Sequence, residues 1–189
     1  EAVHEKIIHR IVEPMHAYIS ANETPYRGVL FIGLMIDDND DPFVVEFNVR
    51  FGDPECQVTL PLVKTDVFSL LYGAATDGLH ALSLEVHSGS SVTVVLASEG
   101  YPAAPIKGRP IHGLDKALTT TAYGEKWVNF AGVSTSEDGG YIASGGRVLS
   151  CTALGADLAE TQKTAYSLMS ALQLEGGHYR SDIARRAMR

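Results

Sequence analysis

The stretch Phe43-Val-Val-Glu-Phe-Asn-Val-Arg-Phe-Gly-Asp-Pro-Glu55 alternates apolar and polar side chains before it reaches a turn. Successive side chains of a β-strand point to opposite faces, so residues 43–50 are predicted to form a strand whose apolar odd-numbered positions share one face. Glu46, Asn48 and Arg50 then share the other face, each about 7 Å from the next along the strand. Residues 51–55 are predicted to form a loop.

The types of these three polar side chains are those that bind a metal ion and a phosphate group. A carboxylate and an amide carbonyl are hard oxygen ligands, and Mg²⁺ uses only one or two such protein groups while phosphates and water fill its other positions. Glu46 and Asn48 are therefore candidate ligands for Mg²⁺ or Mn²⁺. Arg50 carries a planar, permanently charged guanidinium group that can bind a phosphoryl group. The alternative, a solvated strand face on which Arg50 pairs with Glu46, has equal weight on spacing alone.

The loop that follows offers two further candidates. Gly52 allows a ligand to approach the backbone closely, and Asp53 can hold an amine through a charge-assisted hydrogen bond. The other interpretation of Asp53-Pro54 is a turn that opens the next helix.

Outward from this stretch, the N-terminal part of the chain mixes helices with a hairpin. Apolar residues recur at helical spacing in residues 3–19 and predict an amphipathic helix. Residues 28–36 predict a strand buried on both faces, and the acidic run 37–42 predicts a hairpin turn into the strand described above. A further helix is predicted from Thr65-Asp66 to about Asp77-Gly78.

Beyond residue 87 the pattern changes to short strands separated by glycine turns. Strands are predicted at residues 92–97, 127–133 and 147–152, with a turn at 137–140. Asp157, with Glu160 three residues later, predicts the start of a helix that ends before Gly176-Gly177. The fold class is thus α+β: helices with an antiparallel sheet, followed by a small β-rich domain with one packed helix.

Composition narrows the function classes. The 189 residues include 45% hydrophobic and 20% charged side chains, which is typical of a globular protein. A net charge of −8 disfavours nucleic-acid binding. The apolar runs are shorter than the roughly 20 residues of a membrane-spanning helix, so no membrane partner is expected. Only two cysteines and no secretory pattern at the first residues favour a cytoplasmic location.

Other residues are weaker candidates. The acidic run Asp37 to Asp41 could chelate calcium, but it lacks the EF-hand spacing, and a solvated turn is favoured. His4 and His9 lie five residues apart and do not share the face that a zinc pair would use. Cys56 has no histidine nearby in sequence, so a packed thiol is favoured over a nucleophile. The arginines of residues 180–189 favour a solvated helix over a phosphate site.

The string from Glu46 to Glu55 resembles the signature of the glycinamide ribonucleotide synthetase family of ATP-grasp ligases, the phosphoribosylamine–glycine ligases. The resemblance covers nearly the whole chain and is carried by four further segments, Tyr26-Arg-Gly-Val-Leu-Phe-Ile-Gly-Leu-Met35, Val94-Val-Leu-Ala-Ser-Glu-Gly-Tyr-Pro102, Gly145-Gly-Arg-Val-Leu149 and Tyr179-Arg-Ser-Asp-Ile183. It implies that residues 1–86 are the C-terminal part of an ATP-grasp domain and that residues 87–189 are the C-terminal domain of the family.

The resemblance also implies residue roles and a reaction. Glu46 and Asn48 are the implied ligands of Mg²⁺ or Mn²⁺. Arg50 is the implied catalytic contact to the γ-phosphate of ATP, and Gly52 and Asp53 belong to the same ligand-binding loop. The implied reaction joins glycine to 5-phosphoribosylamine through a glycyl phosphate, with ATP giving ADP and phosphate, in purine biosynthesis.

The chain departs from the family pattern in two ways. Members are much longer, so we expect this chain to be a C-terminal piece that needs the N-terminal half of the same enzyme as its partner and is inactive alone. We expect a monomer or a weak dimer. Where relatives tend to carry His-Ala-Gly-Thr, this chain has Phe130-Ala-Gly-Val133, so a substrate contact by that strand is not expected. The alternative function is a non-catalytic binding module on the same half-scaffold.

Overall fold

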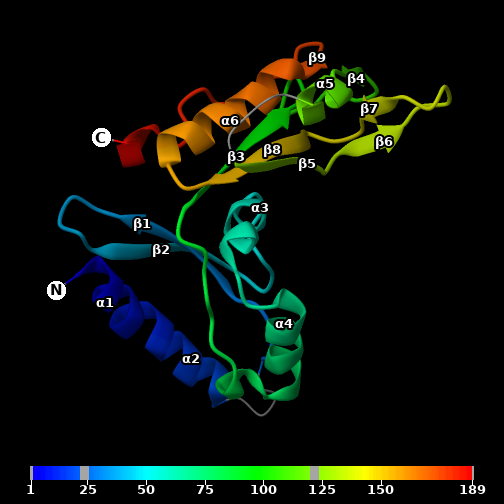
Figure 1. The fold of residues 1–189 in the computed structure, drawn as a ribbon. Coiled ribbons are helices and arrows are strands. Elements are labelled where there is room, and N and C mark those ends of the chain that lie inside the picture. The colour runs from blue at the N-terminus through cyan, green and yellow to red at the C-terminus, as the bar shows by residue number, and fades with distance from the viewer. Residues whose placement is uncertain (1, 22–25, 120–123, 189) are drawn as a thin grey trace. The chain divides into compact units, whose positions relative to one another are not determined.

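The computed structural model describes residues 2–21, 26–119 and 124–188 (Figure 1). Contacts divide the chain into two compact units. The N-terminal unit comprises residues 1–52 and 65–83, and the C-terminal unit comprises residues 53–64 and 84–189. The domain boundary between residues 86 and 87 stays a prediction, but the contact pattern groups the segment 53–64 with the C-terminal unit.

The first helix is confirmed and contains a wider turn. It runs through α1 (Val3–Ile7), a π-helical segment η1 (Ile8–Val12) and α2 (Glu13–Ser20). Pro14 lies two residues after the π-helical segment, inside the continuous helix, where proline cannot donate a backbone hydrogen bond.

Two antiparallel strands, β1 (Phe31–Ile36) and β2 (Pro42–Asn48), form the predicted hairpin. In its turn, Asp37 Oδ1 accepts hydrogen bonds from the backbone N–H groups of Asn39 and Asp41, each at 2.9 Å. The prediction that residues 28–36 are buried on both faces is wrong, because β1 begins at Phe31 and 63% of Met35 is exposed. The acidic run acts as a structured turn.

A bulge changes which side chains share a face of this hairpin. Gly33 pairs with Glu46 and the next residue, Leu34, pairs with Val44, so Val45 is an extra residue in β2. Because Met35 pairs with Phe43, the pleat places Phe43 on the same face as Glu46. The prediction that Phe43 lies opposite the polar residues is therefore wrong: an inserted residue reverses the alternation, as any one-residue slip does.

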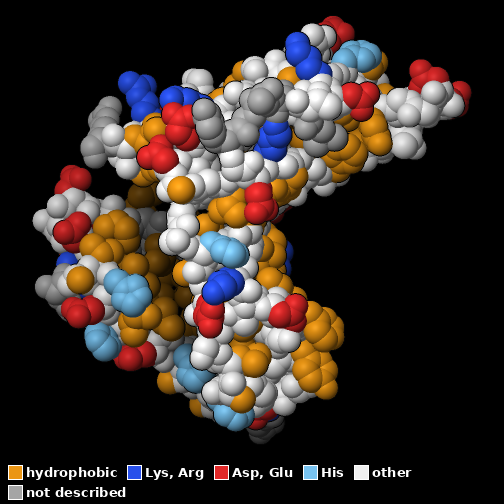
Figure 2. All heavy atoms as spheres, in the orientation of Figure 1, with side chains coloured by type: hydrophobic (Ala, Val, Ile, Leu, Met, Phe, Trp, Pro, Cys, Tyr) orange, Lys and Arg blue, Asp and Glu red, His pale blue; other side chains and the backbone are white. Residues whose placement is uncertain are grey.

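The helix α4 (Val67–Thr76) confirms the predicted capping residues. Asp66 accepts a hydrogen bond from the Ser69 backbone N–H at 2.7 Å, and Asp77 ends the helix in the left-handed conformation with φ of 65°. Gly73 packs where a Cβ would lie 3.0 Å from Leu82 Cδ1, next to the short helix η3 (Leu79–Ala81). The opposite side of α4 carries exposed apolar side chains, which gather at the surface in Figure 2.

The C-terminal unit contains two antiparallel sheets and most of the buried side chains. The first sheet has the order β3 (Ser90–Ala97), β8 (Arg147–Gly155) and β5 (Glu125–Phe130), and α6 (Leu158–Ala171) packs against it. Asp157 caps α6 by accepting from the Glu160 backbone N–H at 2.9 Å, as predicted. The core between α6 and this sheet is formed by fully buried residues that include Val94, Leu149, Cys151, Ala165 and Leu168.

The second sheet and the short helices at residues 60–62 and 114–119 were not predicted from sequence. The sheet has the order β6 (Val133–Thr135), β7 (Tyr141–Ala143), β4 (Pro110–His112) and β9 (Gln173–Leu174). The other elements are α3 (Glu55–Thr59), η2 (Leu60–Leu62), α5 (Leu114–Thr119) and η4 (Arg185–Met188). In the part of the chain that is described, no helix combines the length and apolar character needed to cross a membrane.

Candidate functional site

Glu46 lies in the middle of the hairpin, directly across from a glycine. A Cβ on its partner Gly33 would lie 3.0 Å from Glu46 Cγ, so the missing side chain leaves room for the glutamate to lie across β1. Glu46 is exposed, and no cation within the described ranges forms an ion pair with its carboxylate. The carboxylate is therefore available to a ligand.

Asn48 is the last residue of β2 and shares this face with Glu46, since it pairs with Phe31 in the same register. Its Nδ2 is buried and has no hydrogen-bond partner within residues 2–21, 26–119 and 124–188. An unpaired buried polar group costs about 1–3 kcal/mol, so such groups call for a specific explanation, such as a ligand. The amide nitrogen is thus not held by another group of the described residues.

Arg50 lies beyond the strand, because β2 ends at Asn48 and residues 49–50 form a bend. The predicted strand to residue 50 is therefore too long by two residues, and the pleat does not fix the direction of Arg50. Its Nη1 donates to the Phe51 carbonyl oxygen at 2.8 Å, and the alternative of an Arg50–Glu46 pair is not found in the described part of the chain. An exposed guanidinium held only by a backbone carbonyl keeps most of its donors free for an anion.

Gly52 and Asp53 are adjacent in sequence but fall in different compact units. Asp53 is tied to residues of its own unit. Its Oδ2 accepts from Arg147 Nη2 at 2.8 Å, its carbonyl oxygen accepts from Arg147 Nη1 at 2.6 Å, and its Oδ1 accepts from Gln57 Nε2 at 2.9 Å. The helix α3 begins at Glu55, so the interpretation of Asp53-Pro54 as a turn that opens a helix is confirmed.

Sequence reasoning missed Arg147 as a partner of this loop. The two residues lie 94 positions apart, and no periodicity or spacing connects them. The available signal was indirect: Arg147 belongs to the short segment Gly145-Gly-Arg-Val-Leu149, which is one of the segments that carries the family resemblance.

The donor set fits a magnesium-type ion, although no dense metal cluster is present. Within the described ranges, no group of three or more His, Cys, Asp or Glu side chains is arranged to hold a metal. Mg²⁺ does not require one, because it is commonly bound through one or two protein oxygens together with substrate phosphates. The exposed carboxylate of Glu46 and the side-chain carbonyl oxygen of Asn48, on the same strand face, provide such a pair.

The weaker candidates have structural explanations. Asp41 pairs with Lys6 at 2.9 Å and Arg10 at 2.8 Å, and hydrogen bonds from these two cations hold the pKa of its carboxyl below the usual value. The acidic run therefore joins the hairpin to the first helix. Burial, followed by the charge of Asp53, raises the pKa of the Cys56 thiol, which makes it a poor nucleophile at neutral pH.

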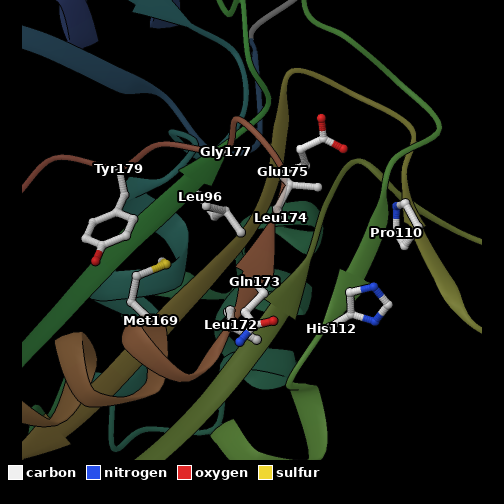
Figure 3. Close-up of a pocket in the computed structure, with 10 residues that line it drawn as sticks. All are labelled: Leu96, Pro110, His112, Met169, Leu172, Gln173, Leu174, Glu175, Gly177 and Tyr179. Carbon is white, nitrogen blue, oxygen red and sulfur yellow. The ribbon is translucent and has the colours of Figure 1, made fainter.

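A cavity of about 560 Å³ lies within the C-terminal unit, far in sequence from the motif strand. Figure 3 shows Tyr179 and Met169 on one side of it and Pro110 and His112 on the other. Its walls are formed by Leu96, Pro110, His112, Met169, Leu172, Gln173, Leu174, Glu175, Gly177 and Tyr179. Glu175 lies 3.6 Å from the Arg109 guanidinium, so its carboxylate has a cationic partner.

Comparison with known proteins shows the family of the chain. Residues 1–56 match the family model described as phosphoribosylglycinamide synthetase, ATP-grasp (A) domain, and residues 91–186 match the model for its C domain. A phosphoribosylamine–glycine ligase of Leifsonia xyli is 43% identical over 187 residues, which are 97% of this chain and 43% of that protein.

Solved structures give the same result. The crystal structure of a phosphoribosylamine–glycine ligase from Thermotoga maritima aligns with 94% of this chain and 42% of its own length, with a TM-score of 0.72 and 36% identity. N5-carboxyaminoimidazole ribonucleotide synthetase from the same organism shares the fold, with a TM-score of 0.58 and 18% identity.

The matched models define the class of protein, one that contains part of an ATP-grasp domain. More narrowly, the chain belongs to the phosphoribosylglycinamide synthetase family. It spans about 43% of the length of the curated relatives it matches.

Proposed function

We propose that this chain forms the metal- and phosphate-binding part of a ligase that joins glycine to 5-phosphoribosylamine at the expense of ATP. The observation that carries the proposal is the exposed face of the β1–β2 hairpin, where Glu46 has no cationic partner and the Asn48 amide has no hydrogen-bond partner among the described residues. Family membership supports the choice of reaction.

The reaction proceeds in two steps. A carboxylate resists attack by an amine because it has no good leaving group, so a glycine carboxylate oxygen first attacks the γ-phosphorus of ATP. The bond from this phosphorus to the bridging oxygen breaks, giving glycyl phosphate and ADP. The amine of 5-phosphoribosylamine then attacks the glycyl carbonyl carbon, phosphate leaves, and the nitrogen loses a proton as the amide forms.

Each candidate side chain has a role in this scheme. Glu46 and Asn48 hold Mg²⁺ or Mn²⁺, which neutralises polyphosphate charge when bound. Arg50 contacts the γ-phosphate and stabilises the charge on the phosphoryl group as it moves, using guanidinium donors that the protein leaves free. The exposed Asp53 carboxylate accepts hydrogen bonds from a substrate amine, whereas Gly52 is buried and is given no direct ligand contact.

The N-terminal half of the same enzyme is the proposed partner. The N-terminal unit leaves apolar side chains exposed on both the hairpin and α4, among them Phe43, Val45 and Phe68. Exposed apolar surface of this extent indicates an interaction site. The relatives are more than twice as long as this chain, which supports their additional part as the occupant. A cytoplasmic location and a monomer or weak dimer complete the proposal.

The test is ADP formation by the complete native polypeptide. If the native gene encodes only these residues, a chimera with the N-terminal part of the Leifsonia xyli relative replaces it. We expect ADP release that requires glycine, 5-phosphoribosylamine and a divalent cation together, and its loss in Glu46→Gln. ATP binding without turnover would contradict the ligase and support the alternative of a non-catalytic binding module.

A further inference from the structure

Arg147 holds the Asp53 segment by two different groups at once. One guanidinium nitrogen donates to the Asp53 carboxylate at 2.8 Å and the other donates to the Asp53 carbonyl oxygen at 2.6 Å. Because the guanidinium group is planar and rigid, binding the Asp53 side chain and backbone together fixes the direction of both. Gln57 Nε2 donates to the other carboxylate oxygen at 2.9 Å, so both oxygens of the Asp53 carboxylate accept a hydrogen bond.

The backbone that carries the Arg147 side chain is held on both sides by hydrogen bonds. The Arg147 carbonyl oxygen accepts from the Gly132 backbone N–H at 3.0 Å, and the Ser98 backbone N–H donates to Gly146 O at 2.8 Å. A Cβ on Gly132 would lie 2.7 Å from the Cα of Gly145, so two glycines let these backbone segments approach closely. A side chain anchored on such a base can orient another residue reproducibly.

The pair is too exposed to serve mainly as a stabilising contact. The side chains of Arg147 and Asp53 retain 38% and 45% of their accessible surface. Water and salt screen ion pairs of this kind, so their contribution to folding free energy is small. Arg147 and Gln57 each occupy one acceptor position of the Asp53 carboxylate, and a carboxylate has about four such positions. The exposed remainder can still accept hydrogen bonds from an amine.

We propose that Arg147 is a positioning residue of the ligase, which holds the Asp53 carboxylate in the direction that an amine substrate meets. This inference rests on the proposed function, in which Asp53 contacts that amine. Lysine cannot replace Arg147, because one ammonium group does not reproduce the fork that reaches both the carboxylate and the carbonyl.

The experiment compares Arg147→Lys with Arg180→Lys in the complete ligase. Arg180 is the matched control, since it also forms a two-point pair with an aspartate, Asp182, at 3.0 and 2.9 Å in the same unit. For Arg147→Lys we expect kcat/KM for glycine or 5-phosphoribosylamine to fall about 10-fold, with the KM for ATP and the Tm unchanged. Arg180→Lys should match the wild type in all of these measurements.

A double variant tests whether Arg147 acts through Asp53. If it does, Asp53→Asn together with Arg147→Gln loses no more activity than Asp53→Asn alone. The proposal would be overturned if the activity losses of the two single variants multiplied in the double variant. An Arg147→Lys enzyme with unchanged kcat/KM for both amine substrates would also overturn it. A parallel loss of ATP affinity, amine affinity and Tm would also overturn it, because that pattern indicates a purely structural role.

Hydrogen exchange separates this inference from the function on which it rests. Arg147→Gln should speed exchange of the backbone amides in residues 55–59, and Arg180→Gln should not; equal exchange in both would contradict the positioning role. A wild-type ligase without glycine-dependent ADP formation would instead overturn the proposed function and, with it, the role of Asp53 toward an amine. An active wild type with an unaffected Arg147→Lys overturns the positioning role alone.

Discussion

The two units of the chain distribute their apolar side chains in opposite ways. In the C-terminal unit, α6 covers the β3–β8–β5 sheet, and residues such as Val94, Leu149 and Leu168 are fully buried. In the N-terminal unit, Ile11 is the buried large apolar side chain among the described residues, while Phe43, Val45 and others stay exposed.

This difference separates stability from chemistry. The C-terminal unit has a hydrophobic core of its own, which is the main requirement for independent folding. The N-terminal unit instead presents the Glu46 and Asn48 face together with exposed apolar surface. We therefore expect substitutions on the Glu46 and Asn48 face of the first unit to affect catalysis and substitutions of fully buried residues of the second unit to affect folding.

The largest effect is expected at Arg50. In the complete ligase, Arg50→Ala should lower kcat by about 10³-fold, because a cation at a moving phosphoryl group contributes at least this much in related chemistry. The Tm should not change, since Arg50 is exposed and bonded only to a backbone carbonyl. Steady-state ADP release and thermal unfolding measure both. Arg27→Ala, which removes another exposed arginine of the same unit, is the control; equal activity in the two variants would refute the assignment.

A pair of substitutions tests the difference in packing directly. Leu168 is 0% exposed in the C-terminal unit, so Leu168→Ala should cost about 2–5 kcal/mol of unfolding free energy. Phe68 is 73% exposed on α4, so Phe68→Ala should stay within about 0.5 kcal/mol in this chain. Urea denaturation measures both values. Comparable losses would mean that the apolar surface of the N-terminal unit is packed in solution.

A smaller effect is expected at the glycine opposite the candidate metal ligand. In Gly33→Ala, the new Cβ would lie 3.0 Å from Glu46 Cγ and would shift that side chain. The apparent affinity for the divalent cation should weaken about 10-fold, the size typical of residues that orient a ligand. Titration of ADP release with Mg²⁺ measures this. An unchanged metal dependence would show that Glu46 is not placed by the space above Gly33.

The smallest effect concerns acid stability of the N-terminal unit. Hydrogen bonds from Lys6 and then Arg10 lower the pKa of Asp41 in the folded chain. The contribution of this group is therefore complete above the ordinary aspartate pKa of about 3.9 and disappears as pH falls through the lowered folded value. Asp41→Asn should remove the contribution of this carboxyl to the pH dependence of unfolding, which circular dichroism follows between pH 5 and pH 2. Asp38→Asn in the same turn should leave it in place.

Local elements could be predicted from the sequence because their signals are local. Asp66 and Asp157 cap α4 and α6 as their positions indicate, and the acidic run forms the hairpin turn. The helical stripe of residues 3–19 became a continuous helix with a π turn inside it.

The remainder depends on pairing between distant residues. The bulge at Val45 is set by how β2 pairs with β1, and alternation within residues 43–50 contains no sign of it. The contact between Arg147 and Asp53 requires β8 to lie beside the segment that leads into α3. Of the candidate site, the residue types and the shared face of Glu46 and Asn48 could be predicted, but not the end of the strand before Arg50.

The β1–β2 ladder has only two strands within the described residues. Each strand therefore leaves one row of backbone N–H and carbonyl groups without a neighbouring strand, and such edges invite pairing with any extended peptide. At high concentration the chain is thus expected to self-associate through main-chain hydrogen bonding at these edges.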